Sequence, residues 1–339
     1  MTPLVEVEGL NVRFFGDRNV HAVNDLSFSL REGEVLGLLG ESGSGKSVTL
    51  RALMRLLPKK RTQISGSIRV LGRNVLALDE EELSAFRGQT VSMIFQEPAT
   101  ALDPVYTIGR QISETVIRHE GKSQKQAMAR ALEMLEVVRI PSARRRLDAY
   151  PHEMSGGMRQ RAMIALALAC KPKILLADEP TTALDATVQI QILLLLRELQ
   201  REFGMSVIFV THDIGVAIEI CDRVAVMYAG QIVEQGTLSQ IVRSPLHPYA
   251  RGLLASTVLR AKRGQRLETI PGTPPSLDHA PTNCSFAPRC SFAEARCVER
   301  MPPNVQIAPD RVARCILAER AETLTDQANW AGSTNITRY

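Results

Sequence analysis

Two patterns of hydrophobic and polar positions divide the chain along its length. The first residues alternate between apolar and acidic, and residues 4–36 as a whole predict short strands joined by polar turns. From about residue 107 to residue 170 the pattern becomes helical, and Ser123 with Gln126 has the spacing of a helix capping box. The chain therefore predicts a β-rich start and a later helical part.

Several apolar, β-branched segments predict strands in the centre of the fold. They are residues 35–39, 67–71, 91–95, 174–177 and 206–210, with a hairpin over 224–228 and 231–235. The segment 47–57 predicts a helix that stops at Pro58, and the segment 187–203 predicts an amphipathic helix that ends at Gly204. Strands that alternate with helices in this way are typical of an α/β fold with a parallel sheet.

The composition of the chain changes near its C-terminal end. Residues 270–310 are rich in Pro, Cys and Arg, which predicts a small separate module. Thr, Asn, Ser and Gly dominate after about Leu324, so we expect a disordered tail there. The expected division is a main domain over 1–255 with its helical subdomain at about 97–170, a C-terminal module over 256–323 and a tail over 324–339.

The bulk composition excludes several classes of protein. Hydrophobic residues make up 45% of the 339 residues, enough for a sizeable core, which argues against a disordered chain. The net charge is only +5 and aromatic residues are 4%, so no nucleic-acid partner is expected. No apolar run reaches the length of a membrane span, and the N-terminus does not have the pattern of a signal peptide. We expect a cytoplasmic chain that contacts a membrane only through a partner.

A glycine-rich loop lies between the predicted strand 35–39 and the helix that follows it. Its sequence is Gly40-Glu41-Ser42-Gly43-Ser44-Gly45-Lys46-Ser47. Glycines let the backbone N–H groups wrap closely around phosphates, and the start of the helix adds its positive end. Lys46 is predicted to contact the β and γ phosphates of ATP, and the Ser47 hydroxyl to bind Mg²⁺.

Two carboxylates end a buried strand further along the chain. Asp178 and Glu179 follow the apolar segment 174–177 and precede Pro180. A carboxylate at the end of a buried strand is costly unless it has a partner. We predict that Asp178 holds Mg²⁺, directly or through water, and that Glu179 polarises the water that attacks ATP, because phosphoryl transfer relies mostly on positioning and charge.

The order of four motifs resembles the ATPase subunit of an ATP-binding-cassette (ABC) transporter over roughly the first three-quarters of the chain. The motifs are the phosphate loop, Met154-Ser155-Gly156-Gly157-Met158-Arg159-Gln160-Arg161, Ile174-Leu175-Leu176-Ala177-Asp178-Glu179-Pro180 and Val210-Thr211-His212-Asp213. The resemblance implies an α/β P-loop NTPase cassette. It implies an N-terminal antiparallel β subdomain, an inserted helical subdomain and, here, a small C-terminal Cys-rich module.

The resemblance also implies roles for four residues around ATP. Gln96 matches the glutamine loop of the family, which reaches the metal and the attacking water. His212 matches the switch histidine, which contacts the γ phosphate. An aromatic residue near the N-terminus usually stacks on the adenine ring, and both Phe14 and Phe15 are candidates.

A second group of motif residues implies a dimer of cassettes. In the family, the turn that matches Ser155, Gly156 and Gly157 binds the ATP held by the opposite cassette, and the loop that holds Asp185 couples the two cassettes. Met158 stands where the family more often has Gln, and we expect the turn to work nonetheless because the backbone and Ser155 make the contact. The chain has one such set, so a partner cassette is required.

Four segments resemble the oligopeptide and dipeptide import branch of the family. They are residues 96–104, 154–161, 244–249 and 284–290. The branch implies an ATP-hydrolysing subunit at the cytoplasmic face of the inner membrane, with a sister ATPase, two membrane permease subunits and an external solute-binding protein. The cargo stays open, because nickel, opines, glutathione and cell-wall peptides are handled by the same branch. ABC ATPases that act on ribosomes or DNA usually have two cassettes or a long coiled-coil insertion, and neither appears here.

Four of the six cysteines crowd into the C-terminal segment, with the spacing C-x5-C-x6-C-x17-C. They are Cys284, Cys290, Cys297 and Cys315. Four thiolates fit either zinc or an iron–sulfur cluster. The absence of a close C-x2-C pair in this segment weakens the interpretation as a zinc ribbon. The resemblance favours a [4Fe-4S] cluster that stabilises the fold, with Zn²⁺ as the alternative. The other two, Cys170 and Cys221, are expected only to pack in the core.

Overall fold

A four-stranded antiparallel sheet forms the N-terminal part of the protein. The computed structural model describes residues 3–182, 184–257 and 269–318. The sheet has the order β2-β1-β4-β5, with β1 at Val5–Phe14, β2 at Val20–Leu30, β4 at Thr62–Val70 and β5 at Arg73–Asn74. The predicted β subdomain is confirmed, although β1 and β2 are single long strands rather than several short ones.

An eight-stranded sheet forms the centre of the fold, in the order β11-β12-β10-β9-β3-β8-β7-β6. Its strands are β3 (Val35–Leu39), β6 (Val91–Ile94), β7 (Ile174–Asp178), β8 (Ser206–Thr211), β9 (Arg223–Tyr228), β10 (Gln231–Thr237), β11 (Asn304–Ala308) and β12 (Arg311–Arg314). The neighbouring strands β9, β3, β8, β7 and β6 run parallel. The pairs β9–β10, β10–β12 and β12–β11 are antiparallel. Every residue of β3, β7 and β8 is buried, which explains their continuous apolar sequences.

The hairpin predicted near residue 230 is β9 and β10. Ala229 and Gly230 join the two strands, and both have positive φ angles, 48° and 79°. Two positive φ angles are what a type I′ turn requires, and that turn matches the twist of the strands.

The helices account for the segments predicted to be helical. They are α1 (Lys46–Leu53), α2 (Glu80–Ala85), α3 (Pro98–Ala101), α4 (Ile108–Glu120), α5 (Gln124–Val137), α6 (Ala143–Arg146), α7 (Gly156–Leu168), α8 (Ala186–Glu202), α9 (Ile214–Ile220), α10 (Leu238–Arg243), α11 (Pro248–Ala255) and α12 (Ala295–Glu299). The capping box of Ser123 and Gln126 starts α5 as predicted. Helix α1 ends earlier than expected, and Arg55 just beyond it adopts a positive φ of 49° that helical backbone cannot contain.

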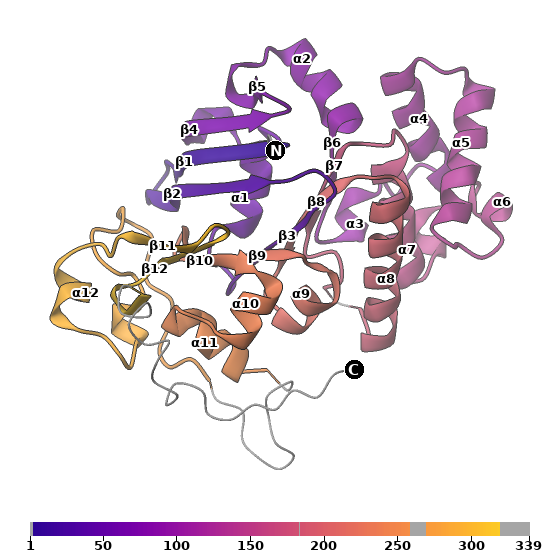
Figure 1. Ribbon diagram of the computed structural model, residues 1–339. Coiled ribbons are helices and arrows are strands. Elements are labelled where there is room, and N and C mark those ends of the chain that lie inside the picture. Colours follow the sequence, from indigo (N-terminus) through magenta and orange to yellow (C-terminus); the bar gives the residue numbers. More distant parts are fainter. Residues whose placement is uncertain (1–2, 183, 258–268, 319–339) are drawn as a thin grey trace.

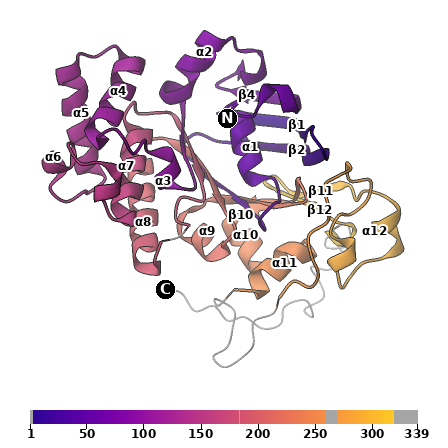
Figure 2. The same ribbon diagram turned by 180° about the vertical axis from the view of Figure 1, so that it is seen from behind.

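The inserted helices lie on one side of the central sheet. Helices α4, α5, α6 and α7 are grouped together, and the C-terminal segment with α12 lies on the opposite side of the molecule in both views (Figure 1, Figure 2). Buried residues of α4, α5 and α7, among them Ile112, Leu135 and Ile164, join one continuous core with the central strands. This arrangement confirms a helical subdomain inserted into an α/β fold.

The C-terminal segment is not the separate module that its composition predicted. Strand β12 pairs with β10, with Ala313 opposite Glu234 and Val312 opposite Gln235, so the segment continues the central sheet. The side chain of Arg311 is buried against the carboxylate of Glu234 at 3.2 Å. An edge strand presents unpaired N–H and C=O groups, and β12 covers those of β10. The predicted tail, 324–339, lies outside the described residues.

A buried histidine at the start of α11 predicts a pH-dependent loss of stability. His247 is 2% exposed, and its Nδ1 accepts the backbone N–H of Tyr249 at 3.0 Å. Burial lowers the pKa of His247 from 6.5 to about 3. The unfolded chain therefore takes up the proton at a higher pH than the folded chain, and acidification towards pH 5 favours unfolding.

The variant His247→Asn keeps a side-chain oxygen for the N-cap and removes the proton-binding group. Between pH 7 and pH 5 the wild type should lose about 2 kcal/mol more unfolding free energy than the variant. Urea titrations at both pH values measure the difference. The Glu234 carboxylate accepts the backbone N–H of residue 247 at 2.8 Å. Glu234 is present in both proteins, so its own effect on the unfolding free energy cancels in the comparison. Equal losses of unfolding free energy in the two proteins would show that His247 is not the group responsible for the pH dependence.

Candidate functional site

A cavity of about 790 Å³ lies beside the phosphate loop, near the last residues of β7 and β8. This volume is within the range of small-molecule sites. Residues of the N-terminal sheet and of the segments that follow β3, β6, β7 and β8 line it. Nine of the lining residues were predicted to act on ATP: Phe14, Ser42, Gly43, Gly45, Lys46, Ser47, Gln96, Glu179 and His212. Side chains that are far apart in the sequence meet here because parallel strands place their carboxyl ends at one edge of the sheet.

The ammonium group of Lys46 lies inside the phosphate loop. Its Nζ donates to the carbonyl oxygens of Gly40 and Glu41 at 2.7 and 2.8 Å, and to the Ser44 hydroxyl at 3.3 Å. Lys46 is 4% exposed, and burial lowers its pKa, against the opposing effect of nearby carboxylates. These three acceptors are neutral oxygens, so an anionic phosphate would supply the countercharge that they lack.

Two predicted Mg²⁺ ligands lie side by side below the loop. The Ser47 hydroxyl, at the start of α1, donates to Asp178 Oδ1 at 2.6 Å. Asp178 is 1% exposed, and burial raises the pKa of its carboxyl while the Ser47 hydrogen bond opposes the rise. A hydroxyl and a carboxylate are oxygen ligands of the type that Mg²⁺ prefers, and Gln96 lines the same cavity. The residues therefore fit a magnesium ion.

The carboxylate of Glu179 is the centre of a group of polar side chains. Its Oε2 accepts from the Thr182 hydroxyl at 3.0 Å and from Gln96 Nε2 at 3.4 Å, and lies 3.1 Å from His212 Nδ1. Sequence reasoning assigned no role to Thr182, although a hydroxyl three residues after Glu179 was a usable signal. The structure thus brings together all three residues predicted to be catalytic.

The backbone of Glu179 is strained. Its φ is 46°, a left-handed conformation that is uncommon for a residue with a side chain, and its N–H donates to the carbonyl of Val210 at 3.1 Å. The anchored backbone turns the chain sharply at the end of β7. Strain of this kind persists where the surroundings hold it and is frequent at functional sites.

One wall of the cavity is apolar. Phe14 lines it together with Val20, Ala22 and Leu277, whereas Phe15 does not line it and is 45% exposed. Phe14 is thus the better placed of the two candidates for stacking on adenine. Sequence reasoning missed Leu277, which reaches the cavity because its carbonyl accepts the N–H of His21 at 2.7 Å. No local motif signals a contact between residues so far apart in the sequence.

The Ser-Gly-Gly turn lies apart from the cavity. Ser155 caps α7 by accepting the N–H of Met158 at 3.3 Å, and Gly156 has open space where a Cβ would stand. At Gly157 a Cβ would meet Val188 of α8 at 3.0 Å. Asp185 caps that same helix α8 through the N–H of Val188 at 3.0 Å. These residues therefore lie together where α7 meets α8. Among the described residues that line the cavity, none of them is present.

The four C-terminal cysteines are free thiols in this structure. Burial raises the pKa of Cys284 and Cys290 and brings that of Cys315 to about 11, and neighbouring cysteines add to each rise. The Cys284 N–H donates to the Cys297 carbonyl at 3.0 Å. Within residues 3–182, 184–257 and 269–318, no three His, Cys, Asp or Glu side chains are arranged to hold a metal ion. The predicted cluster is therefore not confirmed.

Two family descriptions match the chain. Residues 23–182 match the ABC transporter family, and residues 233–297 match the oligopeptide/dipeptide transporter C-terminal region. The first match spans the phosphate loop and Glu179, and the second spans His247 and three of the four C-terminal cysteines.

Relatives and solved structures resemble the chain over most of its length. A peptide ABC transporter ATP-binding protein of Sinorhizobium fredii is 50% identical over 92% of this chain and 94% of its own. A peptide import ATP-binding protein of Brucella abortus is 49% identical over 93% of this chain and 97% of its own. A dimeric ATP-binding cassette in a post-hydrolysis state with ADP and phosphate superposes with a TM-score of 0.62, at 31% identity over 69% of this chain and 98% of its own.

Proposed function

The chain belongs to the ATP-binding subunits of ABC transporters, in the peptide-import group, and we propose that it hydrolyses ATP to power uptake of di- or oligopeptides through a membrane permease. The observation that carries the proposal is the meeting of the phosphate loop, the Ser47–Asp178 pair and the Glu179 group around one cavity. In this proposal residues 1–255 form the ATP-binding part and residues 256–323 an attached C-terminal segment.

The residues of the cavity divide the work of phosphoryl transfer among them. The phosphate loop and Lys46 bind the phosphates and offset their charge. Ser47, Asp178 and Gln96 would hold Mg²⁺, which neutralises charge that develops on the phosphate oxygens. Glu179 would orient and polarise the attacking water, and His212, whose Nδ1 lies 3.1 Å from Glu179 Oε2, would contact the γ phosphate.

The remaining site residues support a dimer of cassettes. Cassettes of this family dimerise and act on permease subunits, and the similar solved cassette is itself dimeric. We propose that Ser155, Gly156 and Gly157 bind the ATP of the opposite cassette, and that Asp185 couples the two sites through α8. Their place at the α7–α8 junction, apart from their own cavity, supports this assignment. We further propose that the opposite cassette is a sister subunit rather than a second copy.

The chain is proposed to lie on the cytoplasmic face of the inner membrane, bound to two permease subunits that receive cargo from an external solute-binding protein. None of the helices in the described residues is long and apolar enough to cross a bilayer. Purification of the tagged chain from detergent-solubilised membranes tests the assembly. We expect membrane subunits and a second cassette to co-purify, and ribosomes or DNA in their place would contradict the proposal.

Peptide is the favoured cargo because the matching C-terminal region and the relatives belong to peptide importers. The same ATPase role would serve a nickel, opine or glutathione importer, because the cassette does not touch the cargo. ATP hydrolysis by the reconstituted transporter separates these cases. Stimulation by a peptide-loaded binding protein supports the proposal, whereas stimulation by nickel alone contradicts the peptide assignment.

A metal at Cys284, Cys290, Cys297 and Cys315 is a separate proposal, either a [4Fe-4S] cluster or Zn²⁺. The hydrogen bond from the Cys284 N–H to the Cys297 carbonyl and the packing of both residues in one small cluster with Ala287 support it. The absence of a ready ligand group among the described residues opposes it. No step of ATP hydrolysis depends on this metal. In anaerobically purified protein, iron and sulfide near about four per chain, lost in Cys290→Ser, would support the cluster. One colourless zinc would support the alternative, and protein without metal would contradict both.

A further inference from the structure

An arginine of the C-terminal segment forms an ion pair with a residue of the phosphate loop. Arg289 lies 248 residues beyond Glu41, and its two terminal nitrogens donate to the Glu41 carboxylate at 2.7 and 3.1 Å. The Arg289 side chain is 5% exposed and that of Glu41 is 26% exposed. A two-pronged arginine–carboxylate pair fixes orientation as well as distance. The pair therefore holds one residue of the phosphate loop in a defined place.

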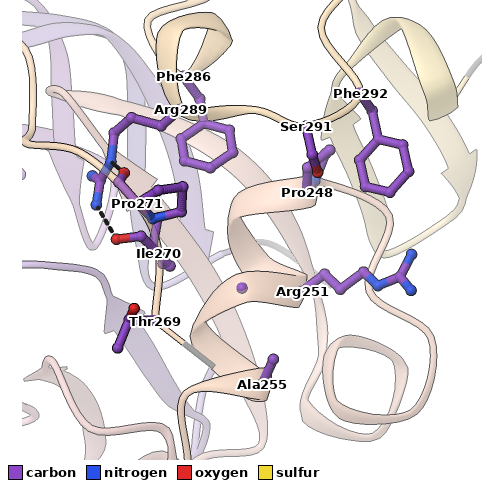
Figure 3. A pocket seen from close by; sticks show the side chains of 11 residues that line it. Pro248, Arg251, Ala255, Thr269, Ile270, Pro271, Phe286, Arg289, Ser291 and Phe292 are labelled. Atoms are coloured by element: carbon purple, nitrogen blue, oxygen red, sulfur yellow. Dashed lines mark hydrogen bonds between the residues drawn. The ribbon is translucent and has the colours of Figure 1, made fainter. Parts of the chain in front are cut away.

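Arg289 is itself held on its other side. Its Nε donates to the Pro271 carbonyl at 2.7 Å, and its terminal nitrogens reach the Ile270 carbonyl at 3.4 Å and the Tyr228 hydroxyl at 3.3 Å. Figure 3 shows the guanidinium directed towards Ile270 and Pro271, beside the ring of Phe286. The same side chain lines a second cavity, of about 250 Å³, between α11 and the C-terminal segment. Arg289 thus connects the C-terminal segment to the loop through one guanidinium.

Glu41 is held through three of its groups, the carboxylate, the carbonyl and the backbone N–H. Its carboxylate accepts from Arg289, its carbonyl accepts from Lys46 Nζ at 2.8 Å, and its N–H donates to the Tyr249 hydroxyl at 2.8 Å. Glu41 also lines the nucleotide cavity. A loop that binds phosphate through its own N–H groups works best when they already point inward, because ordering them upon binding costs free energy.

An aromatic cluster makes the anchor rigid. The rings of Tyr228 and Tyr249 are 4.6 Å apart, and the ring of Phe286 lies 5.2 Å from the first and 5.4 Å from the second. All three residues are buried, and they come from β9, from α11 and from the C-terminal segment. Packed rings leave little room for movement. The groups that hold Glu41 therefore stand on a fixed support.

We infer that Arg289 is a positioning residue for ATP binding, which holds the phosphate loop in its binding shape through Glu41. The inference rests on the proposed ATPase function. Arg289 does not line the nucleotide cavity, so its effect passes through the loop and not through a contact with ATP. The C-terminal segment is then part of the machinery that binds the nucleotide.

The test compares ATP affinity and steady-state hydrolysis in full-length variants. Arg289→Met removes the guanidinium and keeps most of the apolar stem of the side chain, and we expect it to raise both the Kd and the KM for ATP about tenfold. The kcat should change less than about twofold, since Glu179 is untouched. Arg289→Lys should recover only part of the affinity, because one ammonium cannot reproduce a fork.

A matched control exists in the same segment. Arg314 is also buried, at 9% side-chain exposure, and donates to the Asp25 carboxylate at 3.0 Å. Neither residue lines the nucleotide cavity. Arg314→Met should lower the melting temperature without moving the KM. A rise in KM that equals that of Arg289→Met would mean that any loss of packing in the segment weakens binding, and would overturn the inference.

A second variant keeps the test informative if Arg289→Met folds poorly. Glu41→Gln removes the charge that Arg289 binds, and should raise the KM about threefold or more. Combining it with Arg289→Lys should add little further loss, because both changes break the same contact. Fully additive losses, or a folded Arg289→Met with the wild-type KM, would overturn the inference. A wild-type chain that hydrolyses no ATP would instead overturn the proposed function.

Discussion

Replacing Glu179 with glutamine is expected to lower the kcat for ATP hydrolysis by at least about 100-fold while ATP still binds. The change keeps the size of the side chain and its contacts with Thr182 and Gln96, so the cavity should keep its shape. It removes the negative charge that, in the proposed mechanism, polarises the attacking water. Because Lys46 and Ser47 are unchanged, the Kd for ATP should stay within about threefold of the wild type.

The measurement is ATP turnover by purified full-length protein, with ATP binding followed in parallel. Glu219→Gln is the matched control, because Glu219 is exposed on α9 and the same charge is removed outside the cavity. The control should keep the wild-type rate. A Glu179→Gln protein that still hydrolyses ATP at half the wild-type rate would show that another group activates the water, and His212 would be the next candidate.

Replacing Gly45 with alanine is expected to cost about 3 kcal/mol or more of unfolding free energy. Gly45 is the N-cap of α1, and its φ of 100° is one that residues with a side chain rarely adopt. A Cβ there would also stand 2.5 Å from the Ala22 carbonyl oxygen, which is a backbone atom and cannot move aside cheaply. The two costs arise at the same atom and add to each other.

Gly43 provides the comparison for this prediction. Its φ is 80°, and a Cβ built on it meets nothing within 4 Å, so Gly43→Ala carries the conformational cost alone. We expect that variant to lose about 1 kcal/mol. Urea titrations of the two variants and the wild type, without nucleotide, measure both losses of unfolding free energy. Equal losses would mean that the crowding at Ala22 is relieved by a small shift of β2, and the steric part of the argument would then be wrong.

The fold and the chemistry of the site could be predicted where the signal is local in the sequence. Three such signals are the phosphate loop, the strand that ends at Asp178 and the capping box at Ser123. In each, the spacing and type of about ten neighbouring residues determine the local structure. The helical insertion was likewise visible as a change of period. These segments appear in the structure where their patterns placed them.

Contacts between distant segments were beyond such reasoning. The composition of the C-terminal segment indicated a separate module, yet its last two strands continue the central sheet, because pairing with the open edge of β10 outweighs composition. Leu277 and Arg289 meet the nucleotide cavity and its loop only through that packing. The segment 284–290 resembles the import branch, but nothing in its sequence assigns Arg289 to the phosphate loop, and no motif marks Leu277. Only the tertiary structure identifies these two roles.

The pairing of β10 with β12 sets a limit on how the gene can be shortened. A fragment that stops at residue 255 would retain Glu234, 1% exposed in the intact fold, and would remove Arg311, which binds it. It would also expose β10 as a free template for another chain, the usual start of edge-to-edge aggregation. Expression vectors for this subunit should therefore carry residues up to at least 318.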